Sequence, residues 1–513
     1  MAAPSEKLAE SLEVLGRLQR NGSVAIRARD LSRTHRERLL RDGFLQEVMK
    51  GWYVPSRPDE MPGESTAWYT SFWRFCADYL VSRFGTDWSL SPEQSLLLHA
   101  DNWTVPPQLL VRSPKGRNKV TPLPHRTSLL DIRAALPAPT EVCERAGLRF
   151  FSQEAALVAC SPRFFNQHPT DARAVLANLP DASTLLARLL AGGNSTVAGR
   201  LAGALRNTGQ DRLADEILET MRTAGYDVRE QDPFQDHSRQ PLPIREKSPY
   251  ANRIHLLWEQ MRGPVLERFP APPVPPTEID TFLHRIEESY PADAYHSLSI
   301  EGYNVSPELI ERVRSGEWNP DRKGADQEHL NALAARGYWQ AFLQVKNAVR
   351  RVLAGENPGN VAEEEHGRWF RELFAPTVSA GLLRPMDLAG YRSGQVYIRC
   401  SMHVPPNPAA VRDAMPVFFE LLREEQESSV RAVLGHFLLV YIHPYPDGNG
   451  RIGRFLMNVM LAAGGYPWTM VPVGNKSEYL ATLEAASVRQ DIVPFTEFIA
   501  GLVKGRLAGR PIP

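Results

Sequence analysis

A histidine, a carboxylate, a glycine-rich turn and two arginines lie together in residues 443–454, which read His-Pro-Tyr-Pro-Asp-Gly-Asn-Gly-Arg-Ile-Gly-Arg. Two apolar runs, 430–442 and 452–463, flank this stretch and predict helices. The prolines end the first helix, and the Gly-Asn-Gly turn at 448–450 opens the second. A helix that begins there leaves backbone N–H groups without partners, and such groups bind phosphates. The stretch therefore predicts a phosphate-binding turn edged by arginines.

Two side chains in this turn can act on a bound phosphate. Asp447 can hold Mg²⁺, because Mg²⁺ takes one or two carboxylates together with substrate oxygens. His443 lies at the lip of the turn and is a candidate general base. The alternative is a solvated turn between two core helices. The density of chemically suited residues favours the phosphate site.

The spacing of the turn resembles the signature of Fic-domain proteins, H-x-[F/Y]-x-[D/E]-G-N-G-R-x-x-R. The chain matches this signature at His443, Tyr445, Asp447, Gly448, Asn449, Gly450, Arg451 and Arg454. Tyr445 stands where the family usually has Phe, and its ring can fill the same apolar pocket. The resemblance implies an all-helical Fic core, which we place in residues 246–513.

The same resemblance implies how the turn binds a nucleotide, with ATP and Mg²⁺ as the expected ligands. Asp447 holds the Mg²⁺, and the backbone N–H groups of 448–450 hold the α- and β-phosphates. The side chains of Asn449 and Arg451 add hydrogen bonds, and Arg454 binds the γ-phosphate. The cofactor-binding residues are thus Gly448, Asn449, Gly450, Arg451 and Arg454.

The implied reaction is transfer of AMP from ATP to a Ser, Thr or Tyr hydroxyl of a protein. His443 takes the proton of that hydroxyl as its oxygen attacks the α-phosphorus. Tyr479 follows the second helix, where members of the family contact adenine. Other members use the same turn to move a phosphate or phosphocholine, or to remove AMP. Retained Asp447, Gly450 and both arginines favour AMP transfer.

Residues 297–302, Ser-Leu-Ser-Ile-Glu-Gly, match the [S/T]-x-x-x-E-[G/N] inhibitory motif of Fic proteins. Their i, i+4 spacing puts Ser297 and Glu301 on one face of a helix. We expect Glu301 to form a bidentate pair with Arg454 and to take the place of the γ-phosphate. The alternative is a capped turn with a surface glutamate, and the nearby signature favours regulation.

Residues 388–399 are short, β-rich and bounded by glycine inside an otherwise helical region. They resemble the flap hairpin of Fic proteins. Its edge strand, here Gln395, Val396, Tyr397 and Ile398, would take an extended target segment by strand addition. A hairpin that only covers the core is the alternative, and both roles can hold together.

The spacing of apolar residues predicts helices almost throughout the part of the chain that must position these motifs. The expected helices are 250–262, 278–290, 306–314, 328–353, 366–374, 407–424, 428–442, 451–463, 476–486 and 494–508. The fold class expected for the whole chain is therefore mainly α, with a small flap hairpin.

Residues 1–55 predict a helix at 6–20, one or two more at 28–42, and then a hairpin over 44–54. Three helices followed by a hairpin is the order of a winged helix. Eight arginines and two acids lie between residues 17 and 41. A basic helix of this kind could lie in a DNA groove with its arginines on phosphates. A solvated charged face on a protein-binding module is an equally weighted alternative.

Residues 56–245 predict an α+β region, with strands at 108–112 and 148–151 and helices later. This region resembles, loosely, antitoxin-type regulators of the AbiEi class. Polar, proline-bearing residues 230–249 predict a linker, and the proline run 270–276 predicts a stiff extended segment. A DNA-binding regulator or antitoxin whose Fic half senses nucleotide is therefore the alternative function.

Composition limits the class of protein further. The formal net charge is zero, so the chain as a whole is not a polyanion binder. The four cysteines show no CxxC spacing, which predicts buried thiols in a reducing cytoplasm. No signal pattern and no apolar run near twenty residues is present, so we expect a cytoplasmic protein without a membrane partner. The protein substrate is not indicated, and a homodimer stays open.

Overall fold

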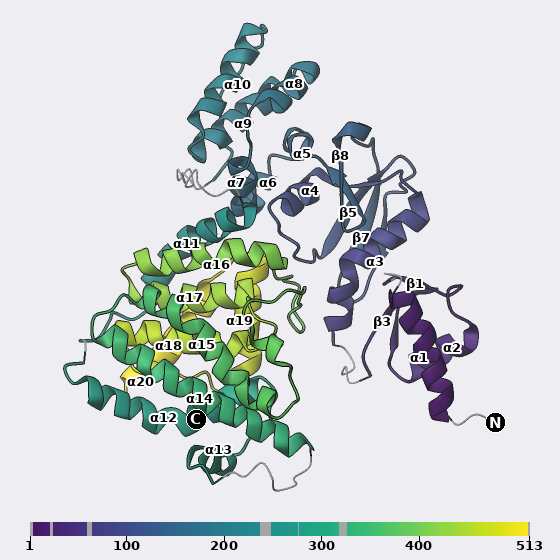
Figure 1. Ribbon diagram of the computed structural model, residues 1–513. Helices are drawn as coiled ribbons and strands as arrows, with labels where there is room; N and C mark the ends of the chain where they lie inside the picture. Colours follow the sequence, from purple (N-terminus) through teal and green to yellow (C-terminus); the bar gives the residue numbers. More distant parts are fainter. Residues whose placement is uncertain are drawn as a thin grey trace. The chain divides into compact units, whose positions relative to one another are not determined.

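The computed structural model describes residues 4–20, 24–58, 64–235, 248–274, 276–317 and 326–510. Helices form most of these residues, which confirms a mainly α fold class (Figure 1). The chain divides into two compact units. Unit 1 contains Met1–Pro249 and Tyr397–Val404, and unit 2 contains Tyr250–Val396 and Pro405–Pro513. The predicted division into 1–55, 56–245 and 246–513 stays a prediction.

The start of unit 1 contains two helices and three strands. They are α1 (Pro4–Arg20), β1 (Ile26–Arg27), α2 (Arg33–Arg41), β2 (Leu45–Met49) and β3 (Trp52–Pro55). The predicted hairpin is confirmed as β2 and β3, and β1 pairs with β3. Of the one or two helices predicted at 28–42, the structure has one, α2, and before it Asp30 accepts a hydrogen bond from the Arg27 N–H and closes a turn. Ser32 then caps α2 by accepting from the His35 N–H.

The middle of unit 1 joins helices to small sheets. Its elements are α3 (Thr66–Phe84), β4 (Ser89–Leu90), α4 (Pro92–His99), β5 (Gln108–Ser113), β6 (Lys119–Pro122), β7 (Ser128–Arg133), β8 (Val142–Arg145) and β9 (Leu148–Phe151). The larger sheet has the order β4-β5-β7-β6, and only β5 and β7 are parallel. The two predicted strands are confirmed as β5 and β9. The helix α3 buries an aromatic face that includes Trp68, Phe72 and Phe75.

A helical subdomain follows in unit 1. It consists of α5 (Gln153–Ala159), α6 (Phe164–Gln167), α7 (Pro169–Ala177), α8 (Ser183–Gly192), α9 (Ser195–Asn207) and α10 (Asp211–Thr223). Residues 228–235 cross α9 at two glycines, where a Cβ on Gly199 or Gly203 would overlap a carbonyl oxygen of the crossing segment. The predicted linker at 230–249 is therefore packed over 230–235. Residues 236–247 of that linker lie outside the described residues.

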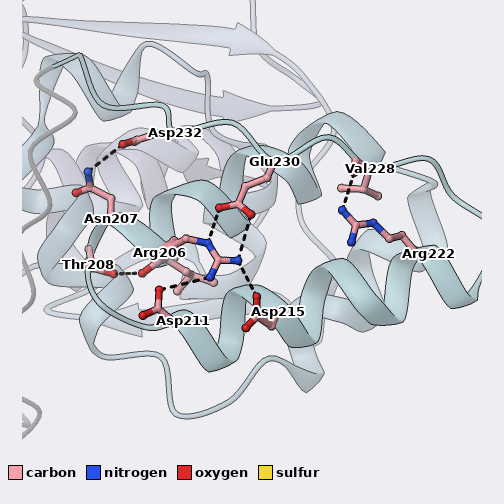
Figure 2. A network of polar contacts seen from close by, with 10 residues as sticks. Arg206, Asn207, Thr208, Asp211, Asp215, Arg222, Val228, Glu230 and Asp232 are labelled. Atoms are coloured by element: carbon pink, nitrogen blue, oxygen red, sulfur yellow. Dashed lines mark hydrogen bonds and ion pairs between the residues drawn. The ribbon is translucent and has the colours of Figure 1, made fainter.

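An arginine on α9 ties the crossing segment in place (Figure 2). Arg206 forms ion pairs with Glu230 and Asp215 at 2.7 Å each and with Asp211 at 3.5 Å. The next residue, Asn207, donates its amide to Asp232 at 3.0 Å. These contacts satisfy the arginine with carboxylates from α10 and from the crossing segment.

Residues 397–404 pack within unit 1 although they lie late in the sequence. Arg399 forms an ion pair with Glu64 at 2.7 Å. The Cys400 N–H donates to the Thr66 hydroxyl at 3.1 Å, and Val105 N–H donates to the Met402 carbonyl at 2.9 Å. Cys400 is exposed, which corrects the expectation that all four thiols are buried.

Unit 2 is a helical assembly around one apolar core. Its helices are α11 (Pro249–Arg268), α12 (Ile279–Ile300), α13 (Pro307–Arg314), α14 (Asp326–Leu353), α15 (Pro358–Ser379), α16 (Pro408–Glu424), α17 (Ser428–Ile442), α18 (Asn449–Ala463), α19 (Lys476–Arg489) and α20 (Val493–Leu507). Every predicted helix of this part is confirmed, with ends that differ by several residues. Pairs of these helices, α14 with α15 and α17 with α18, pack along each other. Across the described residues, none of the helices is long and apolar enough to cross a bilayer.

Candidate active site

The turn at 443–450 joins α17 to α18 and is held by its own asparagine. The Asn449 amide donates to the Tyr445 carbonyl at 2.9 Å, and its oxygen accepts from the Tyr445 N–H at 2.9 Å. The Tyr445 ring is buried and stacks on Phe370, with ring centroids 4.1 Å apart. Asn449 is 1% exposed. Its side chain therefore shapes the turn, which corrects the expectation that it contacts phosphate.

The first turn of α18 has the open form that the sequence predicts. Gly448 precedes the helix with φ of 83°, a left-handed conformation that favours glycine, and no side chain caps the N-terminus within the described residues. A Cβ on Gly448 would lie 2.9 Å from the Phe374 ring. The Gly448 N–H donates to Asp447, and the N–H groups of Asn449 and Gly450 that follow it can bind an anion.

His443 ends α17 in a left-handed conformation, with φ of 54° and ψ of 58°. Its Nδ1 lies 3.1 Å from the Val440 carbonyl oxygen, so Nδ1 carries the proton and Nε2 keeps a free lone pair. Desolvation of the ring lowers the pKa of His443 to about 4, a shift that the cation Arg392 supports and the anions Asp447 and Glu301 oppose. A neutral imidazole at physiological pH can accept a proton.

Asp447 presents an exposed carboxylate at the mouth of the turn. Its side chain is 63% exposed and accepts from the Gly448 N–H at 2.6 Å and from Arg451 at 3.3 Å. Arg451 is 1% exposed and lies against the rings of Tyr303 and Phe374. Its buried Nε has no hydrogen-bond partner among the residues that the structure describes. The exposed Asp447 carboxylate could coordinate magnesium, and the Arg451 Nε–H could donate to a phosphate bound to that magnesium.

The inhibitory motif and the second arginine of the signature are in contact. Arg454 Nη2 donates to Glu301 at 2.7 Å and to the Ser297 carbonyl at 3.1 Å, and Arg454 Nε donates to the Ser297 hydroxyl at 2.9 Å. The side chains of Ser297 and Glu301 therefore both accept hydrogen bonds from the Arg454 guanidinium. The contact to Glu301 uses one of its oxygens, so the pair is not bidentate as expected.

The end of α12 aims Glu301 at the phosphate turn. Gly302 follows it with φ of 94°, and the Tyr303 N–H donates to the Leu298 carbonyl, which closes a Schellman-type end. A Cβ on Gly450 would lie 2.6 Å from Glu301 Oε1, so this carboxylate covers the first turn of α18. Partial burial opposes its ionisation, but the charges of Arg454 and Arg451 hold the pKa of Glu301 below its usual value.

Tyr479 does not line an open nucleotide site. Its side chain is 2% exposed, and its hydroxyl lies 2.8 Å from His436 Nε2 in the core between α17 and α19. The expected contact with adenine is corrected, because the ring has no free surface. His436 is also buried, and desolvation lowers its pKa to about 3. The two residues form a neutral pair beneath Arg454.

The predicted flap hairpin does not form. Residues 389–399 contain no strand, and only a 3₁₀ turn, Pro385–Leu388, precedes them. Pro405 and Pro406 have no N–H to give to a ladder, and their carbonyls instead accept from Gln395 and Arg392. Of the four expected edge residues, Gln395 and Val396 belong to unit 2, and Tyr397 and Ile398 to unit 1.

Sequence reasoning gave no role to two buried residues beside the predicted site. Arg392 donates to the His443 carbonyl at 2.8 Å from residues 389–406, which we call the flap segment although they form no hairpin. Asp293 lies one helical turn before Ser297 on α12 and accepts from the Tyr338 hydroxyl at 2.7 Å. The i, i+4 spacing that selected Ser297 and Glu301 also reaches Asp293, so extending that pattern one turn would have found it.

A model of the Fic/DOC family matches residues 364–461. The chain therefore contains a Fic/DOC domain. It is similar to proteins named "Protein adenylyltransferase Fic" from Drosophila mojavensis (29% identical over 239 residues) and Drosophila willistoni (32% over 232 residues). Each match covers 44% of this chain and 42% of the relative, so it spans less than half the length of these relatives.

The solved structure of Fic-1 (aa134 - 508) from C. elegans is also similar to this chain. The sequence identity is 18% and the TM-score is 0.36. The match covers 67% of this chain and 95% of that one. The likeness of residues 56–245 to AbiEi-type regulators stays a prediction.

Proposed function

We propose that this protein transfers AMP from ATP to a hydroxyl of a protein side chain. One observation carries the proposal: a histidine with a free Nε2 stands at the open N-terminus of α18 inside a matched Fic/DOC domain. The buried, unpartnered Nε of Arg451 beside that terminus supports an anionic substrate. The names of the similar Drosophila proteins agree with this chemistry.

The residues of the turn divide the work. The backbone N–H groups of Asn449 and Gly450 bind the α- and β-phosphates, and Arg454, when released, binds the γ-phosphate. His443 Nε2 accepts the proton of the target hydroxyl as its oxygen bonds to the α-phosphorus. The bond from that phosphorus to the bridging oxygen breaks, and pyrophosphate leaves. Solvent then takes the proton from His443.

Asp447 is the residue that would hold Mg²⁺. The bound ion would neutralise charge on the phosphates and on the departing pyrophosphate. The exposed carboxylate fits that role because Mg²⁺ requires few protein ligands. Arg451 would orient this carboxylate through its hydrogen bond to Asp447.

We infer that Glu301 inhibits the enzyme. Its carboxylate lies against Gly450 and holds Arg454, which is where the γ-phosphate is expected. ATP and Glu301 would then compete for one guanidinium. Bound ATP is displaced into a pose that hides its α-phosphate from the target hydroxyl.

The test of the proposed function is mass spectrometry of the full chain after incubation with ATP and Mg²⁺. A mass increase of one AMP on the Glu301→Gly protein supports AMP transfer. An adduct with the mass of a phosphate would instead establish a different group transfer at this turn. Loss of AMP from a pre-modified protein, dependent on Glu301, would establish removal as the net activity.

We propose DNA binding by residues 1–55 as a second candidate function, because eight arginines lie between residues 17 and 41. Five of the eight arginines there already have intramolecular partners, namely Arg27, Arg33, Arg36, Arg38 and Arg41. An arginine held by a neighbouring carboxylate offers less to a phosphate. The pairs of Arg33 and Arg41 are exposed and can still exchange, so a gel-shift assay decides the point.

A further inference from the structure

Arg392 is a buried arginine whose contacts are all carbonyl oxygens. It is 3% exposed, and its Nε donates to the His443 carbonyl at 2.8 Å. Its Nη1 donates to the Gly394 carbonyl at 3.0 Å, and its Nη2 donates to the Pro406 carbonyl. Its own N–H donates to the Pro444 carbonyl at 2.9 Å. One residue thus binds both the catalytic turn and the flap segment.

Burying the Arg392 cation in this way lowers the stability of the fold. Each guanidinium nitrogen of Arg392 donates to a carbonyl rather than to a carboxylate, and burial lowers the pKa of Arg392 to about 10. An uncompensated buried cation destabilises a protein, and an apolar side chain of similar volume often packs as well. A role in orienting the groups that it binds explains why an arginine stands here.

The residue before it fixes the root of the flap to α15. The Tyr391 hydroxyl lies 2.9 Å from His366 Nε2, and the two rings stack with centroids 5.9 Å apart. The Tyr391 ring also lies against Tyr445 of the catalytic turn, 5.7 Å between centroids. The contacts of Tyr391 with His366 and Tyr445 therefore fix the backbone next to Arg392.

We propose that Arg392 is a positioning residue that holds the catalytic base and the flap segment in one fixed relation. It acts through the carbonyl of His443, whose left-handed backbone is unfavourable for a residue with a side chain. The same guanidinium fixes the carbonyls of Gly394 and Pro406 on the two arms of the flap. This inference rests on the proposed AMP transfer.

The consequence is a specific effect on the transfer step. Without the guanidinium, the His443 peptide can rotate toward a common backbone conformation and carry the imidazole away from the target hydroxyl. A misplacement of about 1 Å costs roughly 100-fold in rate. The phosphates are bound by the N-terminus of α18 and by Arg454, which Arg392 does not contact, so ATP binding is unaffected.

The experiment uses the full chain carrying Glu301→Gly as the parent, with Arg392→Met and Arg392→Lys added separately. Single-turnover AMP labelling is followed by intact mass, and ATP affinity is measured by calorimetry. The matched control is Arg431→Met, since Arg431 is also a buried arginine, lies on the same helix as His443, and donates to the Glu425 carbonyl.

We expect Arg392→Met to lower the labelling rate roughly 100-fold with the ATP dissociation constant within about twofold of the parent. Arg392→Lys keeps the charge but has fewer hydrogen-bond donors, so its labelling rate should lie between those of the parent and Arg392→Met. Arg431→Met should label like the parent. Hydrogen exchange should rise in 389–396 and 443–447 of the Arg392 variants alone.

Two outcomes overturn the inference. Labelling by Arg392→Met at the parent rate would show that the contact to His443 does not matter. A parallel loss of ATP affinity, labelling and melting temperature would show that Arg392 is only structural. If Arg392→Met does not fold, Arg392→Lys decides by the same criteria. A parent that does not label at all refutes the proposed function instead.

Discussion

Arginines organise both units, but their ion networks differ in what they leave open. In unit 1, Arg206 pairs with three carboxylates and is 32% exposed (Figure 2). In unit 2, Arg454 pairs with one carboxylate, Glu301, and is 6% exposed. The first arginine holds a chain segment through three carboxylates, whereas the second forms an ion pair with Glu301 alone among the described residues, beside the turn that we propose binds ATP.

Under the proposed function, the Arg206 network stabilises the fold, and the Arg454–Glu301 pair acts as a switch. Removing any one carboxylate from Arg206 leaves two others, so no new ligand gains a strong site. Removing Glu301 leaves Arg454 shielded and without the carboxylate that it directly contacts, next to the N-terminus of α18. Loss of one partner destabilises a partly buried ion pair more than an exposed one. A bound triphosphate can supply the missing negative charge there.

The largest expected effect is on the rate of AMP transfer and comes from replacing His443. His443→Ala in the Glu301→Gly protein should lower AMP transfer by about 10³-fold and leave ATP affinity nearly unchanged, because His443 serves only the proton step. Rapid-quench labelling and calorimetry measure the two quantities. Glu230→Gln in unit 1 is the control and should change neither. Equal loss of binding and transfer would show that His443 is structural.

The next effect concerns stability. Arg454→Ala leaves Glu301 partly buried without its cation, so we expect the free energy of unfolding to fall by roughly 2 kcal/mol. Arg206→Ala should cost about 1 kcal/mol, because its carboxylates can turn to water. Urea denaturation followed by hydrogen exchange in each unit compares them. A larger loss for Arg206 would reverse the comparison.

A smaller effect is expected from pH. His443 acts as a base only when neutral, and its lowered pKa is about 4. The rate of transfer should therefore stay level from neutral pH downward and fall as the pH drops through about 4, because the imidazole then becomes charged. A pH–rate profile of the Glu301→Gly protein measures this, with melting temperature as the control. A fall near pH 6.5 would mean that the ring is solvated.

The smallest effect is expected from deletion of residues 1–55. The flap end at 397–404 contacts Glu64, Thr66 and Val105, which the deletion retains, so AMP labelling should be unchanged. Any DNA binding should disappear and, in the intact chain, should weaken steeply with salt. Binding to DNA that is absent or independent of salt would end the regulator hypothesis.

Local patterns predicted most of unit 2 and the centre of its site. Helical periodicity located the helices, and the i, i+4 spacing of Ser297 and Glu301 anticipated their shared contact with Arg454. The helices depend on residues that are near each other in sequence, and the contact with Arg454 was expected because the two motifs occur together in Fic proteins.

The errors came from contacts that sequence spacing does not encode. The flap lacks strands because its neighbouring segment carries Pro405 and Pro406 and because residues 397–404 find partners in unit 1. Tyr479 lies in the core, where its hydroxyl is 2.8 Å from Nε2 of His436, a residue distant in sequence. The amide of Asn449 is used within its own turn.

The measurement that tests the switch most directly is intact-mass analysis of four full-length proteins with ATP and Mg²⁺. They are the wild type, Glu301→Gly, Glu301→Gly with Arg454→Ala, and the unit 1 control Glu230→Gly. We predict strong AMP labelling by Glu301→Gly, almost none by the double variant, and wild-type behaviour by the control, because the gain requires a freed Arg454. Labelling of Glu301→Gly no faster than wild type would contradict the account.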